Sequence, residues 1–100
     1  MQPHIVLSPS GNMGMTVSNT VAVSFPTIAT DVVGGIIVIE TADVRMRFDG
    51  TDPDTSGVDG ATLMMENGIW NITGRDILTR MKFIAPGDPA FVTLMTLKGE

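Results

Sequence analysis

The sequence contains no cysteine and no tyrosine, and its only histidine is His4. Without cysteine there is no disulfide, no thiolate nucleophile and no zinc or iron–sulfur site built on thiolates. His4 stands next to Pro3 in a segment rich in turn residues, which is a poor setting for a catalytic histidine that a buried carboxylate must orient. We therefore expect a protein that is not an enzyme and carries no cofactor.

Positive charge is also scarce. Six lysine and arginine residues are outnumbered by eleven acidic ones, so the net charge is −5, which leaves no basic surface for nucleic acid or anionic lipid. The longest apolar tract, residues 21–39, is interrupted by Pro26 and Asp31 and is not expected to span a bilayer. The N-terminus lacks the cationic and apolar regions of a secretory signal. We expect a chain of a reducing compartment that binds neither nucleic acid nor membrane.

Apolar side chains, in contrast, are plentiful. Hydrophobic residues make up 43% of the chain and charged residues only 17%, whereas soluble domains average about 25% charged residues. The 100 residues make one domain, and a domain of this mass buries about 64% of its extended-chain surface on folding. Two interpretations are open: a well-packed monomer, or a chain whose excess apolar surface is covered by other chains. We favour the second and expect a homo-oligomer.

The distribution of turn residues predicts an all-β fold. Short β-branched segments alternate with glycine, proline, asparagine and aspartate at a spacing typical of an antiparallel β-sandwich or barrel. The clearest strand is residues 43–48, with Val44, Met46 and Phe48 on one face and charged residues on the other. The run 36–39 is apolar throughout and predicts a central strand covered on both faces.

Further features complete the predicted fold. Asn67-Gly68 between two apolar runs is typical of a tight hairpin turn, because both positions tolerate a positive φ. Residues 74–79 are expected to form one helical turn at a corner of the sheet. Strands are expected at 81–84 and 90–97, and we interpret 90–97 as an edge strand with no face polar enough to be left in water.

The N-terminal segment is poor in strand formers, because serine, proline, glycine and asparagine interrupt its apolar runs. We interpret residues 1–19 as an extended N-terminal arm with one short strand, and residues 20–100 as the β-sandwich domain. Ile5, Val6 and Leu7 form that short strand and are candidates for contacting a neighbouring chain.

The most polar segment is residues 49–60, which carries four aspartates among threonine, serine and glycine. Such oxygens suit calcium, but their spacing does not match an EF-hand loop. The same residue types are used by any solvated turn, because Asx turns and positive-φ positions select them. We favour a plain loop and predict no metal site, with calcium binding and a catalytic carboxylate pair as the alternatives.

Residues within the domain are also candidates for partner binding. Arg45 and Arg47 leave the polar face of one strand, where each guanidinium can pair with carboxylates of a partner or, the interpretation we favour, of this chain. Trp70 suits packing in a core or interface better than stacking on a sugar. Phe91 and Leu94 lie on the predicted edge strand, which would add to a partner by strand pairing.

Several short motifs lie in the second half of the chain. Residues 44–54 read VRMRFDGTDPD, residues 74–78 read GRDIL and residues 81–85 read MKFIA. In this region, roughly residues 44–96, the chain resembles small structural proteins encoded among the virion genes of tailed bacteriophages. In those proteins an arginine-bearing strand runs into a DGT-x-P turn, and a glycine-rich hairpin and a corner lead into a strand of the MKFI type.

The resemblance implies a jelly-roll-like β-sandwich that sits on the phage particle. From it we expect a non-enzymatic structural protein, specifically a capsid decoration (cement) protein that oligomerises and stabilises capsomer junctions. Its partners would be the major capsid protein or other virion proteins, and its location the virion, assembled in the host cytoplasm. The alternatives are a neck or tail component, or a small β-sandwich that binds carbohydrate or a host surface through Trp70 and residues 49–60, with or without calcium.

Overall fold

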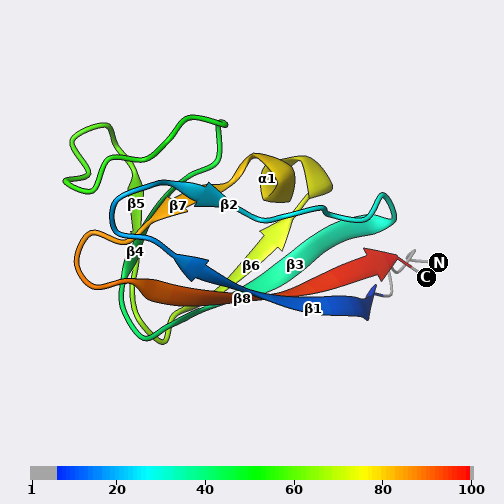
Figure 1. The fold of residues 1–100 in the computed structure, drawn as a ribbon. Helices are drawn as coiled ribbons and strands as arrows, with labels where there is room; N and C mark the ends of the chain where they lie inside the picture. Colours follow the sequence, from blue (N-terminus) through cyan, green and yellow to red (C-terminus); the bar gives the residue numbers. More distant parts are fainter. Residues whose placement is uncertain (1–6, 100) are drawn as a thin grey trace.

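In the computed structural model, which describes residues 7–99, the chain forms two four-stranded antiparallel sheets and one short helix (Figure 1). The elements are β1 (Leu7–Val17), β2 (Val23–Ser24), β3 (Val32–Glu40), β4 (Val44–Arg47), β5 (Thr62–Met64), β6 (Ile69–Thr73), α1 (Arg75–Arg80), β7 (Lys82–Ile84) and β8 (Ala90–Gly99). We call β1-β8-β3-β6 the long sheet and β2-β7-β4-β5 the short sheet. The predicted all-β antiparallel fold is confirmed. Within residues 7–99 no helix is long and apolar enough to cross a membrane.

The strands pair in a nested order, the first with the last and so on inward along the chain. β1 pairs with β8, β2 with β7, β3 with β6 and β4 with β5, and the pairs β3–β8 and β4–β7 complete the two sheets. Every connection except that from β4 to β5 therefore passes from one sheet to the other. The predicted helical turn at 74–79 is present as α1, which follows Gly74 with its φ of 113°.

One hydrophobic core draws side chains from both sheets. Along each strand the inward positions alternate with outward ones, as the pleat requires. Phe83 of β7 meets Phe25 edge to face, with ring centroids 5.1 Å apart, and Leu78 of α1 is fully buried. The largest fully buried side chains come from β1, β3, β4, β5, α1, β7 and β8 and from the residue between α1 and β7; they are Val17, Ile37, Ile39, Val44, Met64, Leu78, Met81, Phe83, Val92 and Leu94.

Two details of the predicted strands are wrong. The strand expected at 43–48 ends at Arg47, and Phe48 is 54% exposed rather than buried beside Val44 and Met46. The chain turns there because Arg47 binds Asp49 and Gly50 takes a φ of 84°. The run 36–39 lies in a central strand, but it is covered on one face only.

The N-terminal prediction also differs from the structure. Residues 7–17, which we assigned to the extended arm, form β1 and pair along their length with β8. Weak strand propensity at Pro9, Gly11 and Gly14 is overridden because β8 offers a long partner strand. Ile5 and Val6 lie outside the described residues, whereas the backbone of Leu7 is in register with Gly99.

The strand β8 is not the edge strand that we predicted. It lies between β1 and β3 and pairs with both, so neither of its backbone edges is open for strand addition. Its inward side chain Leu94 is only 1% exposed, and Phe91 on the outward side is 37% exposed. The central position explains why neither face of this strand is strongly polar.

The turn at Asn67-Gly68 is present, but it does not join two paired strands. Asn67 has the expected positive φ of 67°, and the amide of Gly68 donates to the carbonyl of Met65 at 2.9 Å. The turn carries the chain from β5 in the short sheet to β6 in the long sheet. A local turn signal cannot distinguish such a crossing from a hairpin.

Candidate interaction surfaces

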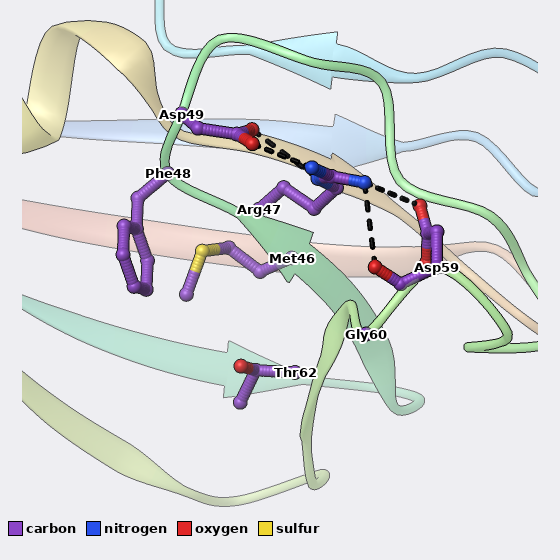
Figure 2. A pocket seen from close by; sticks show the side chains of 7 residues that line it. All are labelled: Met46, Arg47, Phe48, Asp49, Asp59, Gly60 and Thr62. Atoms are coloured by element: carbon purple, nitrogen blue, oxygen red, sulfur yellow. Dashed lines mark hydrogen bonds and ion pairs between the residues drawn. The ribbon is translucent and has the colours of Figure 1, made fainter.

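The acidic loop, residues 49–60, is held against the outward face of the short sheet by cations of that sheet. Arg47 of β4 places its Nη2 at 2.5 Å from Oδ2 of Asp49 and its Nη1 at 3.1 Å from Oδ2 of Asp59 (Figure 2). Lys82, which is in register with Arg47 on β7, binds Asp52 at 3.0 Å. Three of the four loop carboxylates are therefore paired with cations of this chain.

The loop is also organised by its own turns. Oδ1 of Asp54 accepts from the amide of Ser56 at 2.8 Å, and Oδ1 of Asp59 accepts from the amide of Ala61 at 3.1 Å. The glycines at 50, 57 and 60 all have positive φ, a region that L side chains rarely adopt. These features match the solvated-turn interpretation of the segment.

Hydrogen bonds lower the pKa values of three of these aspartates. The Arg47 guanidinium, followed by the Thr51 amide, lowers the pKa of Asp49 from its ordinary 3.8 to about 2. The hydroxyl and amide of Ser56 lower the pKa of Asp54. Partial desolvation opposes the change at Asp59, but the Ala61 amide and Arg47 outweigh it, so that its pKa is also lowered. The contacts favour charged carboxylates in the folded state.

Both candidate arginines of β4 lie under the acidic loop. Arg45 donates from Nη1 to the carbonyl of Ala61 at 3.1 Å, and its guanidinium lies so close to Gly57 that a Cβ there would stand 2.6 Å from Cζ. Its Nε is buried without a hydrogen-bond partner. The structure thus gives Arg45 and Arg47 an internal role, and their binding to a partner stays a prediction.

The described residues offer little for a metal ion. Among residues 7–99 no group of three histidine, aspartate or glutamate side chains is placed to hold one. The oxygens of Asp49, Asp52 and Asp59 that calcium would need are engaged by Arg47 and Lys82. Calcium binding by the loop would have to displace these ion pairs.

The outward face of the long sheet, which we call the bare face, carries almost no charge. The short sheet and α1 lie together on the other side of the long sheet (Figure 1). By the strand registers and the pleat, the bare face comprises outward positions of all four strands, namely Asn12, Gly14, Thr16, Gly34, Ile36, Val38, Glu40, Ile69, Asn71, Thr73, Phe91, Thr93, Met95 and Leu97. Glu40, at one corner, is its single charged residue.

Exposure agrees with this assignment. Ile69 is 68% exposed, whereas Ile36, Val38, Met95 and Leu97 are partly buried by their neighbours within the sheet. Of the predicted contact residues, Phe91 belongs to the bare face and Leu94 to the core. Sequence reasoning missed Ile36, Val38 and Met95, although the apolar run 36–39 was a signal for the first two.

Trp70 lines an apolar groove of about 260 Å³ between β6 and residues of β4, β5 and α1. Its ring is half-buried and packs against the core, as the packing interpretation predicted. The groove brings Trp70 and Ile72 of β6 together with Phe48, Met46, Thr62 and Ile77. No local pattern could have revealed this groove, because its walls come from segments far apart in sequence.

Comparisons with protein-family models, with curated proteins and with solved structures gave no match for this chain.

Proposed function

We propose that this chain is a non-enzymatic structural protein of a tailed-phage particle, specifically a capsid decoration protein that binds the major capsid protein through the bare face. The observation that carries the proposal is the bare face itself. It spans four strands, carries six large apolar side chains among its fourteen positions and has one charged residue, in a chain of net charge −5.

The size of the bare face suits a moderate contact. Four strands about 4.8 Å apart, with outward residues about 6.7 Å apart over four positions, give a footprint of roughly 500 Å². Exposed apolar patches of a few hundred Å² mark interaction sites, although a standard interface buries about 800 Å² on each partner. A single contact would be weak, and many copies on a capsid lattice would raise the avidity.

The strand order supports a finer description of the fold. First pairs with last strand, second with seventh, third with sixth and fourth with fifth, and this nested order supports the proposed jelly-roll sandwich. Jelly rolls are common in viral capsid and lectin domains, but a fold alone does not fix a function. The resemblance over residues 44–96 to virion proteins of tailed phages favours the particle over the lectin alternative.

The contacts of Trp70 and the acidic loop also speak against the carbohydrate alternative. The indole packs against the core and does not stand free as a stacking platform, and three of the four loop carboxylates are bound by Arg47 and Lys82. A neck or tail position is also compatible with the bare face. The location of bound protein on the particle distinguishes it from a capsid position.

Binding to particles tests the proposal. Labelled protein is mixed with particles of the phage that encodes the chain and separated on a density gradient, and bound label is located by electron microscopy. Val38→Lys places a charge on the bare face, and Thr55→Lys makes the same change of charge on the exposed acidic loop as the matched control. We expect wild type and the control to coat heads and Val38→Lys to bind at least tenfold more weakly. Label on tails only, or equal binding by Val38→Lys, would contradict the proposal.

A further inference from the structure

The two sheets have four edge strands, and three of them carry features that hinder pairing with another chain. β1 contains Pro9 and a shift of register between Pro9 and Gly11, while β2 and β5 are two and three residues long. Prolines, bulges, short strands and charges are the usual protections of a sheet edge. β6 has none of them, since its five residues read IWNIT. The edge of β6 is the unprotected one.

The open hydrogen-bonding groups of β6 can be assigned from its contacts with β3. Gly68 and Gly74 flank β6. The amide of Gly74 donates to the carbonyl of Val33 at 2.8 Å, and the carbonyl of Gly68 accepts from the amide of Ile39 at 3.0 Å, so the backbone groups of both glycines point toward β3. By the alternation of an antiparallel ladder, Trp70 and Ile72 also bond toward β3. The amides and carbonyls of Ile69, Asn71 and Thr73 therefore point away from the sheet.

These three residues are accessible. The side chains of Ile69, Asn71 and Thr73 are exposed, and Asn71 and Thr73 also border the groove beside the strand. Among the described residues β6 pairs with β3 alone. The edge thus presents donors and acceptors at every second residue, which is the template that an added antiparallel strand needs.

We propose that β6 pairs with β6 of a second copy of this chain, antiparallel and with the two-fold axis at Asn71. Ile69 then lies opposite Thr73 of the second copy, and Asn71 lies opposite Asn71 of the second copy. All the outward-pointing groups find partners in about six backbone hydrogen bonds. Two four-stranded sheets become one continuous sheet of eight strands.

The sequence of β6 fits itself in this register. Trp70 lies opposite Ile72 of the second copy on the groove side, and an aromatic beside a β-branched residue is a favourable cross-strand pair. Ile69 and Thr73 make the β-branched pair on the other face. No charge lies in β6 or on its flanking glycines, Gly68 and Gly74, so two chains of net charge −5 can approach here without opposing carboxylates.

The pairing specifies how the proposed decoration protein would self-associate. Its geometry is argued from β6 alone, and only its use on a particle rests on the proposed function. Residues paired across the axis point to the same side of the sheet, so the bare faces of both copies form one surface of roughly 1,000 Å². A dimer would hence bind a capsid by two adjacent faces. This continuity gives the dimer a use in decorating a particle.

The position of the axis makes the proposal testable by charge reversal. Asn71→Lys and Asn71→Glu each place like charges against each other across the axis, and an equimolar mixture places opposite charges there. Both side chains point to solvent on the bare face, so the fold should be retained. Thr55→Lys is the matched control for added charge.

Sedimentation equilibrium gives the outcomes. We expect wild type and Thr55→Lys to approach twice the 10.6 kDa of one chain, each Asn71 variant to dimerise at least tenfold more weakly, and their mixture to recover the dimer. Amide hydrogen exchange at Ile69, Asn71 and Thr73 should be slow in the wild type and fast in Asn71→Lys, with Trp70 and Ile72 slow in both.

A wild type that stays monomeric, a dimer insensitive to Asn71→Lys, or a mixture that stays monomeric would overturn the pairing. These results leave the bare face untouched, because a monomer that coats heads would contradict only the pairing. A wild-type dimer that ignores particles would contradict only the proposed function.

Discussion

The ring of Phe91 lies over the backbone of Gly14 on the neighbouring strand. A Cβ at Gly14 would stand 2.5 Å from Cζ and 2.9 Å from Cε2 of Phe91, and the registers put Phe91 opposite Thr16, one outward position from Gly14. The missing side chain of Gly14 therefore makes room for an aromatic ring that would otherwise project from the bare face. The contact ties the edge strand β1 to β8.

This contact predicts a change of sign in a double-mutant cycle. Gly14→Ala in the wild type should destabilise by about 1 kcal/mol, because the Phe91 ring has to leave its place. In the Phe91→Ala background, Gly14→Ala should be neutral or stabilising by up to about 1 kcal/mol, because alanine loses less backbone freedom on folding. Urea unfolding of the four proteins measures both. Equal effects of Gly14→Ala in the two backgrounds would mean that the ring does not occupy this space.

Gly34 is predicted to tolerate substitution much less well. A Cβ there would stand 2.5 Å from the backbone oxygen of Ile72 on β6, and a backbone atom cannot move aside as a side chain can. Gly34→Ala should cost about 1–3 kcal/mol in the free energy of unfolding. Gly87→Ala, where nothing lies within 4 Å, is the control and should change stability by less than about 0.5 kcal/mol. Similar values for the two variants would argue against the close pairing of β3 with β6.

The ion pairs of the acidic loop predict a dependence of stability on acid pH. The pKa of Asp49 is lowered to about 2 in the folded state and is ordinarily 3.8, so between these values the unfolded chain binds more protons. The stabilisation is complete above about pH 4 and is lost as the pH falls toward 2. Arg47→Gln removes the main cause of the lowered pKa, so the thermal midpoint should depend less on pH across this range. Arg80→Gln on α1 should leave the pH dependence unchanged. An unchanged slope in Arg47→Gln would show that the loop is not held by this pair.

Calcium is predicted to leave the stability unchanged. A ligand that binds only the folded state raises the thermal midpoint, but calcium would first have to break the pairs that Arg47 and Lys82 make with the loop. Melting curves in excess calcium and in chelator should coincide at neutral pH. A rise in the midpoint with calcium that Asp52→Asn abolishes would restore the metal-binding alternative.

Local pattern predicted part of this fold correctly. Alternation placed Val44 and Met46 inward and their arginine neighbours outward, because a strand with one buried face has period two. The loop at 49–60 and the helical turn after Gly74 were also readable, since turn chemistry is local. The end of β4 before Phe48 was not readable, because it depends on an ion pair with the loop.

Strand partners were the part that sequence could not supply. β8 was predicted at an edge and lies in the centre, because β1 pairs with it across more than seventy residues of sequence despite poor strand propensity. The bare face and the open edge of β6 follow from these long-range registers. Of the two predicted contact residues on β8, Phe91 lies on the bare face and Leu94 is buried.

Oxidative footprinting of the bare face tests the proposed role most directly. Hydroxyl radicals oxidise accessible methionine and phenylalanine, so Met95 and Phe91 on the bare face can be compared with Met65, which is 63% exposed beyond the end of β5. We predict that Met95 and Phe91 are oxidised in free protein and protected on particles, while Met65 is oxidised in both. Equal oxidation of Met95 and Phe91 in the free and the particle-bound protein would contradict the claim that the bare face is covered by the capsid.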